Sequence, residues 1–265
     1  MRNDYVIDLE TKYSFDEVGG RDRFADLGVS YIGLYSYAQD KFFGFRENEL
    51  EKLNPILEKA DRIIGFNVLH FDLPVLTPHV TVDLKRIPVL DIFDDVTEVL
   101  GFRAGLGALS KATLGKEKLG KGLDSLKWYR EGNWEQLEKY CLQDVLLTRD
   151  LYEHGKKHGH LLFDSFGEGK RIAIPVKWNF AQEAEIRARL KEALERQKAM
   201  EIDYVSREDA GDGYFKKRKI EIRRLLDDSI EAYCHLRKDV RHFRIGRILD
   251  ARVLDESYNS PQTLF

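Results

Sequence analysis

The sequence has few of the residues that mark extracellular or membrane proteins. Two cysteines, Cys141 and Cys234, among 265 residues are too few for a disulfide scaffold or a cysteine-based zinc finger. No apolar run approaches the ~20 residues that a helix needs to cross a bilayer. No basic stretch followed by an apolar stretch marks a signal peptide. We therefore expect a protein of the reducing cytoplasm that makes no membrane contact.

A large charge of one sign is also missing. The 43 Lys and Arg residues against 46 Asp and Glu residues give a net charge of −3. This balance excludes a globally basic nucleic-acid-binding protein but permits a locally basic surface. Hydrophobic residues at 43% and charged residues at 34% indicate a soluble globular chain. At roughly 100–200 residues per domain, the length predicts one large domain or two small ones and leaves the oligomeric state open.

The first part of the chain alternates strand and helix patterns, which predicts an α/β domain. Period-2 alternation indicates strands, and apolar residues at spacings of three and four indicate helices. The strands at 28–36 and 41–46 are expected to form a hairpin. The full set is strands at 4–10, 28–36, 41–46 and 63–66, and helices at 47–60, 90–100 and 134–154.

The second part of the chain has a different pattern. Periodicity fades between residues 163 and 178, where we predict a linker. A charged helix at 182–197 precedes short alternating segments, which predict a small β-barrel or sheet. The predicted strands are 201–206, 219–222, 230–236 and 241–245.

Four acids and a tyrosine are candidates for metal-dependent catalysis. Asp8 and Glu10 stand two apart on a predicted strand, so both point to one face, where a divalent cation would remove their repulsion. Asp72 is expected at the start of a helix, whose positive end favours its ionised form. Tyr140 and Asp144 stand four apart and share one helix face.

Each of these pieces also has an ordinary structural explanation. Asp8 and Glu10 are compatible with a solvated strand end. Asp72 is compatible with a helix N-cap. Tyr140 and Asp144 are compatible with a simple side-chain hydrogen bond.

Taken in order, the three pieces resemble a known nuclease superfamily. The matching segments are Val6-Ile-Asp8-Leu-Glu10-Thr11, Asn67 to Asp72, and Tyr140-Cys-Leu-Gln-Asp144. They resemble the DEDD 3′–5′ exonucleases of the tyrosine subgroup, and the second and third look most like the proofreading domains of family B DNA polymerases. The resemblance implies a ribonuclease H-like fold with a central mixed sheet.

The resemblance also implies roles for individual residues. Two divalent cations, Mg²⁺ or Mn²⁺, would be bound by Asp8, Glu10, Asp72 and Asp144, with Asp8 as the bridge. Tyr140 would orient the attacking water, with help from Glu10. The candidate substrate-binding residues are Leu9, Asn67, His70 and Phe71; for His70, a surface histidine is the competing interpretation.

Other side chains invite weaker hypotheses. Asp91 follows an apolar stretch and is a candidate for lining the site. A Gly/Lys-rich segment offers phosphate contacts or a solvated loop; its lysines are Lys111, Lys116, Lys118 and Lys121. Three histidines invite a metal interpretation, although a solvated helix end is the competing one; they are His154, His158 and His160.

The C-terminal segment resembles a WYL domain. The most specific part of this resemblance is Arg241-His-Phe-Arg-Ile-Gly-Arg247, and the aromatic residues of the naming triplet are absent near residues 228–230. The family implies a lead helix, a small mainly-β fold of Sm or SH3 type, and a nucleic-acid or nucleotide ligand. Arginine suits phosphates and aromatic rings stack on bases. The candidate contacts are Tyr204, Ser206, Arg237, Arg241, Arg244 and Arg247; pairing of the arginines with nearby acids is the alternative.

Together these patterns give one organisation and one leading function. We expect an exonuclease-like domain at 1–162, a linker and the start of a connecting helix at 163–184, a WYL-like domain at 185–258 and a tail at 259–265. The leading function is a metal-dependent 3′–5′ exonuclease on DNA, with single-stranded DNA as the expected substrate, tethered or regulated by the WYL-like domain. The alternatives are a non-catalytic nucleic-acid-binding regulator and the same nuclease acting on RNA.

Overall fold

The chain folds into two compact units, residues 1–152 and residues 153–265. The computed structural model describes residues 2–120, 122–165, 171–178, 180–205 and 215–258.

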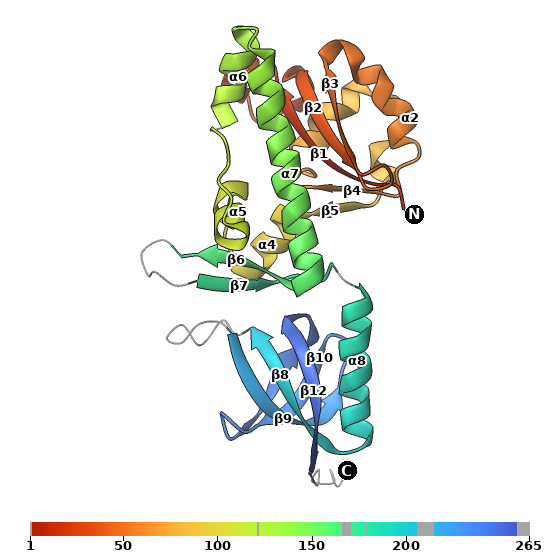
Figure 1. Ribbon diagram of the computed structural model, residues 1–265, viewed down its shortest axis with the longest axis vertical. Coiled ribbons are helices and arrows are strands. Elements are labelled where there is room, and N and C mark those ends of the chain that lie inside the picture. The colour runs from red at the N-terminus through yellow and green to blue at the C-terminus, as the bar shows by residue number, and fades with distance from the viewer. Residues whose placement is uncertain (1, 121, 166–170, 179, 206–214, 259–265) are drawn as a thin grey trace. The chain divides into compact units, whose positions relative to one another are not determined.

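The first unit is built on a five-stranded mixed sheet with the order β3-β2-β1-β4-β5 (Figure 1). β2 pairs antiparallel with both β1 and β3, whereas β4 runs parallel to both β1 and β5. The predicted α/β class and central mixed sheet are therefore confirmed. The strands are β1 (Asp4–Thr11), β2 (Val29–Ser36), β3 (Lys41–Arg46), β4 (Arg62–Gly65) and β5 (Val89–Asp91).

Among the described residues of this unit, seven α-helices begin. The longest of them was predicted at 134–154 from its apolar spacing, and in the structure it extends to His158. The predicted helix at 47–60 is instead a 3₁₀ helix followed by a single α-helical turn, because Pro55 has no N–H to continue a regular helix. The helices are α1 (Phe15–Val18), α2 (Asn54–Leu57), α3 (Asp72–Leu76), α4 (Ile92–Leu100), α5 (Leu106–Leu114), α6 (Gly122–Arg130) and α7 (Trp134–His158); the 3₁₀ helices are η1 (Phe24–Asp26), η2 (Glu47–Leu53), η3 (Thr77–His79) and η4 (Leu84–Arg86).

Helix α7 lies directly on the sheet because β2 carries a glycine at the crossing (Figure 1). A Cβ atom at Gly33 would come within 3.0–3.2 Å of side-chain atoms of Val145, Cys141 and Leu142. The Cys141 thiol also donates a hydrogen bond to the backbone oxygen of Asp8 at 3.2 Å. This close approach brings one face of α7 beside the middle of β1.

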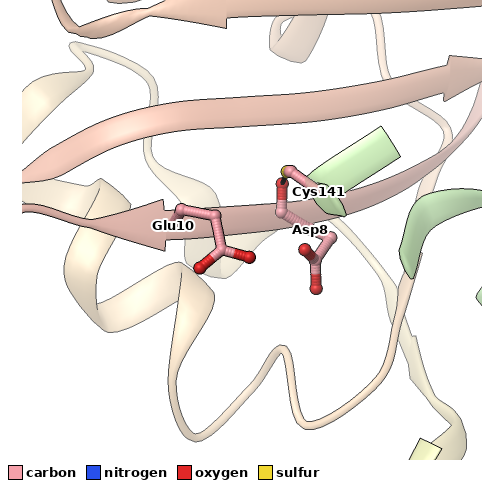
Figure 2. Close-up of side chains that lie close together, drawn as sticks. All are labelled: Asp8, Glu10 and Cys141. Carbon is pink, nitrogen blue, oxygen red and sulfur yellow. Dashed lines mark hydrogen bonds between the residues drawn. The ribbon is translucent and has the colours of Figure 1, made fainter. Parts of the chain in front are cut away.

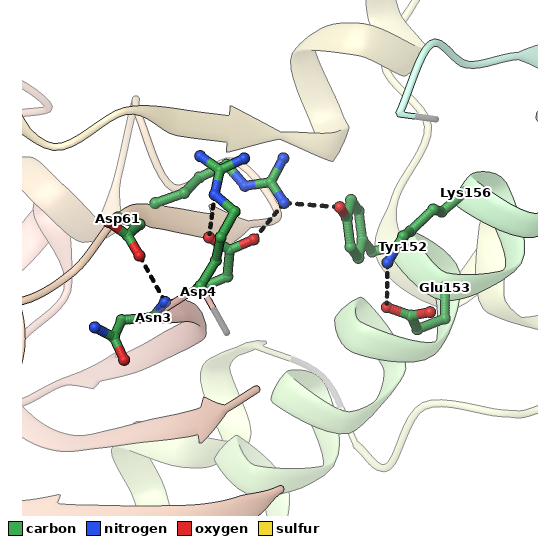
Figure 3. A network of polar contacts seen from close by, with 8 residues as sticks. Asn3, Asp4, Asp61, Tyr152, Glu153 and Lys156 are labelled. Atoms are coloured by element: carbon green, nitrogen blue, oxygen red, sulfur yellow. Dashed lines mark hydrogen bonds and ion pairs between the residues drawn. The ribbon is translucent and has the colours of Figure 1, made fainter. Parts of the chain in front are cut away.

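A polar network fixes the beginning of β1 (Figure 3). The Arg62 guanidinium donates to Asp4 at 2.5 Å and to the Tyr152 hydroxyl at 2.8 Å, so β4, β1 and α7 are tied together. The backbone N–H of Asn3 donates to Asp61 at 2.7 Å. With its start anchored in this way, β1 has a defined register against both neighbours.

The second unit contains a two-stranded antiparallel sheet, a helix and a five-stranded sheet with the order β11-β10-β9-β8-β12. Every pairing in the larger sheet is antiparallel, and α8 packs its apolar side, including Ile186 and Leu190, against it. The predicted helix followed by short strands is confirmed. The elements are β6 (His160–Asp164), β7 (Arg171–Pro175), α8 (Phe180–Glu195), β8 (Lys198–Val205), β9 (Phe215–Leu225), β10 (Ser229–Cys234), β11 (Asp239–Arg244), η5 (Ile245–Arg247) and β12 (Ile248–Ser257).

Part of the segment predicted as a linker forms β6 and β7. Leu161 and Phe163 are buried on one strand, and Ile172 and Ile174 on the other, so both strands contribute to a small apolar interior. Neither His160-Leu-Leu-Phe-Asp164 nor Arg171-Ile-Ala-Ile-Pro175 alternates strictly between apolar and polar residues, so the period-2 pattern does not mark them as strands. Among the residues that the structure describes, no helix is both long and apolar enough to cross a membrane. The predicted tail, 259–265, lies outside the described residues.

Candidate metal centre

Strand β1 carries the first two acids of the site on one face. Their carboxylates lie side by side, as Figure 2 shows, because residues two apart on a strand point the same way. Ligand atoms of Asp8, Glu10 and Cys141 all lie within 4.8 Å of one another, the only such group of three or more metal-binding side chains in the described parts of the chain. The Cys141 thiol faces the backbone oxygen of Asp8, and burial raises its pKa, so it stays a neutral thiol and a poor ligand.

Helix α3 brings the third acid against the same strand. Asp72 is its first residue and is 4% exposed. One of its carboxylate oxygens accepts a hydrogen bond from the backbone N–H of Leu9 at 2.9 Å. Leu9 and Asp72 are 63 positions apart in the sequence. Because Leu9 stands between Asp8 and Glu10 on β1, this hydrogen bond holds the Asp72 carboxylate close to both acids.

Helix α7 supplies the fourth acid and the tyrosine. Tyr140 and Asp144 are both almost fully buried on the face of α7 that approaches β1. The ammonium group of Lys118 lies 2.6 Å from a carboxylate oxygen of Asp144 and 5.0 Å from the centre of the Tyr140 ring. Trp128 of α6 packs edge-to-face on Tyr140 with ring centroids 5.4 Å apart, which fixes the orientation of the ring.

All four acids and the tyrosine line a single cavity of about 290 Å³. A cavity of this size is large enough for a small organic group. Leu9, Asn67 and Phe71 also line it, as the sequence predicted for substrate contacts. The remaining lining residues are Thr11, Tyr13, Ser14, Phe15, Leu27, Phe66, Lys118, Gly122, Leu123, Ser125 and Leu126.

The electrostatics of the cavity favour a bound cation. Desolvation and then the charge of Asp144 raise the pKa of Asp8 well above its usual range. Burial raises the pKa of Glu10 to about 8 and also raises that of Asp72. One carboxylate oxygen of Asp8 and one of Asp144 are buried without a hydrogen-bond partner among the described residues.

Buried carboxylate oxygens that lack donors need either protons or a positive ion. Hard oxygen ligands of this kind suit Mg²⁺ or Mn²⁺. The donor set around Asp8 therefore fits the metal ions that the sequence predicted.

Two predicted participants lie outside the cavity. His70 is exposed and its Nε2 lies 2.9 Å from Asp94, as expected of a surface histidine rather than a substrate contact. Asp91 accepts hydrogen bonds from the backbone N–H groups of Asn67 and Leu69 and caps α4. Asp91 therefore does not line the site but holds the loop that leads to Asp72.

The Gly/Lys-rich segment contributes one lysine to the cavity. Lys111 pairs with Glu117 and Lys116 pairs with Asp150. Neither lysine lines the cavity, so of the two interpretations, phosphate contact and solvated loop, their positions favour the solvated loop. Lys121 lies outside the described residues. Lys118 and Ser125, whose hydroxyl donates to the backbone oxygen of Gly122 at 2.8 Å, both line the cavity. Nothing in their local sequence shows that they face the acids.

The four candidate arginines of the second unit lie on or beside one edge strand of its sheet. Arg241 and Arg244 lie on the edge strand β11, with Arg237 just before it and Arg247 just after it. Tyr204 is buried, and its hydroxyl accepts a hydrogen bond from the backbone N–H of Arg244 at 3.3 Å. Asp250, one of the acids that follow these arginines in the sequence, pairs with Arg189. Ser206 lies outside the described residues.

Comparison with known proteins now identifies the second unit. Residues 185–253 match the WYL domain family. This part of the chain is a WYL domain. Its helix and antiparallel sheet agree with the predicted small mainly-β fold.

The other comparisons add little. No curated protein matches the chain. Among solved structures, the proteasome accessory factor B/C (PafBC) of Arthrobacter aurescens is similar at 20% identity and a TM-score of 0.26. That match covers 51% of this chain and 19% of the PafBC chain, and a TM-score this low does not establish a shared fold. The comparisons lend no support to the exonuclease resemblance of the first unit, which stays a prediction.

Proposed function

We propose that the first unit is a metal-dependent nuclease, a 3′–5′ exonuclease that acts on DNA with single-stranded ends as its expected substrate. The observation that carries this proposal is the convergence of Asp8, Glu10, Asp72 and Asp144 in one cavity. The four acids come from three elements far apart in the sequence, so their meeting is a property of the fold and not of one segment. The polarity of digestion rests on the family resemblance of the three motifs.

The residues of the cavity have complementary roles in this proposal. The four acids would hold divalent cations, which supply an activated water and stabilise negative charge on a phosphate. Burial raises the pKa of Tyr140, so its phenol stays protonated and orients water by donating a hydrogen bond, not by acting as a base. Leu9, Asn67 and Phe71 border the space beside the acids, where a terminal nucleotide would fit.

A second candidate function is a non-catalytic nucleic-acid-binding regulator. The WYL domain at residues 185–253 favours it, and the comparisons support this regulator more than a nuclease. The family resemblance implies a nucleic-acid or nucleotide ligand for this domain. In this second proposal, the cavity of the first unit would bind nucleic acid without cleaving it.

One experiment separates the two functions. Single-stranded DNA labelled at its 5′ end is incubated with Mg²⁺ or Mn²⁺, beside an RNA of the same sequence. We expect a ladder that shortens from the 3′ end, reduced by more than about 100-fold in Asp144→Asn, because a ligand to the metal is lost. The matched control is Asp94→Asn, which removes an exposed carboxylate outside the cavity.

Each outcome has a distinct meaning. Cleavage of DNA that disappears with EDTA and with Asp144→Asn supports the nuclease, and preferential cleavage of RNA changes only its substrate. Binding of DNA without cleavage under either metal contradicts the nuclease and supports the regulator. Cleavage that survives both EDTA and Asp144→Asn contradicts a metal-dependent mechanism in this cavity.

A further inference from the structure

Three histidines at the end of α7 form a cluster separate from the acidic cavity. His154 and His158 stand one turn apart on the helix, and His160 follows as the first residue of β6. Their ring centroids are 4.4 Å apart for His154 and His158, 5.8 Å for His154 and His160, and 6.3 Å for His158 and His160. All three belong to the second compact unit.

The spacing of the rings fits a shared ion. Three imidazoles around a tetrahedral ion, with metal–nitrogen bonds of about 2.0–2.1 Å, keep their ring centroids roughly 5 Å apart. The three observed separations bracket that value. The ring nitrogens are not yet all within 4.8 Å of one another, so at least one ring must turn to complete the triangle, and the exposed His158 ring has room to do so.

Two of the rings are prepared to act as ligands. The Nε2 atom of His154 is buried and has no hydrogen-bond partner among the described residues, a costly arrangement for a polar atom unless something binds there. The Nδ1 atom of His160 lies 2.9 Å from the backbone oxygen of His158. Because a carbonyl only accepts, Nδ1 of His160 carries the proton and Nε2 bears the lone pair, as in histidines that bind metals.

The surroundings keep the His154 and His160 rings neutral. Burial lowers the pKa of His154 to about 4, and it also lowers the pKa of His160. Neutral imidazole is the form that binds metal ions, and no proton must be removed from either ring near neutral pH. The backbone here is firmly packed, since a Cβ at Gly155 would come within 2.4 Å of the Trp178 ring.

We propose that His154, His158 and His160 form a binding site for a borderline transition-metal ion of the Zn²⁺ class. Imidazole ligands select such ions over Mg²⁺ and Mn²⁺, which prefer the oxygen ligands of the acidic cavity. Three protein ligands leave the fourth position to water or another exogenous group. The ion ties the last turn of α7 to β6 and thereby stabilises the second unit.

The test uses the full chain without a histidine tag, titrated with Co²⁺ in the presence of excess Mg²⁺. Co²⁺ is the probe because tetrahedral nitrogen ligation gives it strong visible absorption. We expect one Co²⁺ per chain in the wild-type protein, and binding at least about 10-fold weaker in His158→Ala and in His160→Gln. The matched control is His235→Gln, which removes another histidine of the same unit that pairs with Glu221.

A second readout is thermal unfolding with and without Zn²⁺. Zn²⁺ should raise the Tm of the wild-type protein and of His235→Gln by more than that of His158→Ala. His158 is exposed, so His158→Ala should fold normally without metal. Equal Co²⁺ binding by the wild-type protein and His158→Ala, or equal loss in His235→Gln, would overturn the site.

Discussion

Lys118 provides the positive charge of the acidic cavity through a contact with Asp144 at 2.6 Å. Its side chain is 26% exposed, whereas that of Asp144 is 3% exposed, so the pair is largely removed from water. The contact with Asp144 raises the pKa of Lys118, which remains charged at every ordinary pH. In the protein without metal, this ammonium group is the main charge that offsets the four acids.

Replacing Lys118 should therefore destabilise the metal-free protein. We expect Lys118→Met to lower the free energy of unfolding by about 1–3 kcal/mol at pH 8, because a buried carboxylate loses its partner. Urea unfolding in EDTA measures this loss, and Mg²⁺ should restore more stability to the variant than to the wild-type protein. Lys116→Met is the control, since Lys116 pairs with Asp150 outside the cavity. Equal stability of the two variants would contradict this role.

The raised pKa of Glu10, about 8, predicts how stability changes with pH. The unfolded chain releases this proton near pH 4.3, whereas the folded protein keeps it until about pH 8. The resulting stabilisation is fully present below pH ~4 and is lost as the pH rises through 8. We expect the Tm of the metal-free protein to fall across this window, and divalent cations to reduce the fall.

The control for this pH dependence is Glu10→Gln, which mimics the protonated acid at every pH. Its Tm in EDTA should change less between pH 5 and 9 than that of the wild-type protein. A metal-free wild-type profile that rises with pH would show that the acids are not protonated in the folded state.

At the scale of elements, the site depends on how closely α7 approaches the sheet. Gly33 of β2 lies under Cys141 of α7. Cys141 comes one residue after Tyr140 and three residues before Asp144. We expect Gly33→Ala to push α7 outward, to cost about 1–3 kcal/mol of stability through overpacking, and to weaken Mn²⁺ binding. Chemical denaturation and Mn²⁺ titration measure the two effects.

Gly105→Ala is the matched control for Gly33→Ala. A Cβ at Gly105 meets nothing within 4 Å, and its backbone does not require glycine. We expect Gly105→Ala to leave stability and Mn²⁺ affinity close to those of the wild-type protein. An equal effect of both substitutions would mean that close packing at Gly33 does not set the geometry of the site.

At the scale of the whole molecule, each unit contributes its own candidate nucleic-acid contact under the proposed functions. The acidic cavity would need cations to receive a phosphate, whereas the arginines on or beside β11 would contact phosphates directly. We expect Arg244→Ala to weaken binding of single-stranded DNA and to reduce the slope of log K against log salt by about 0.7. Fluorescence anisotropy at several salt concentrations measures both.

The control here is Arg187→Ala, because Arg187 on α8 is an exposed arginine that already pairs with Glu183. Arg187→Ala should change neither the affinity for single-stranded DNA nor the slope of log K against log salt. If Arg244→Ala leaves the salt dependence unchanged, the edge of the WYL sheet does not contact the phosphate backbone.

The sequence by itself determined the type and order of most elements. The alternation around Asp8 and Glu10 and the helical spacing through Tyr140 and Asp144 are local patterns, fixed by the geometry of a strand and of a helix. They correctly placed each pair of side chains on one face. The WYL domain was likewise recognisable from its local sequence, above all from the stretch Arg241 to Arg247.

Tertiary structure alone decided which of these faces meet. The placement of Lys118 beside Asp144, the exclusion of His70 and Asp91 from the cavity, and the strands β6 and β7 within the expected linker all depend on contacts between distant segments. The ring contacts of His160 with two histidines of α7 have the same origin. Local periodicity cannot encode such contacts, because they arise from the packing of whole elements against one another.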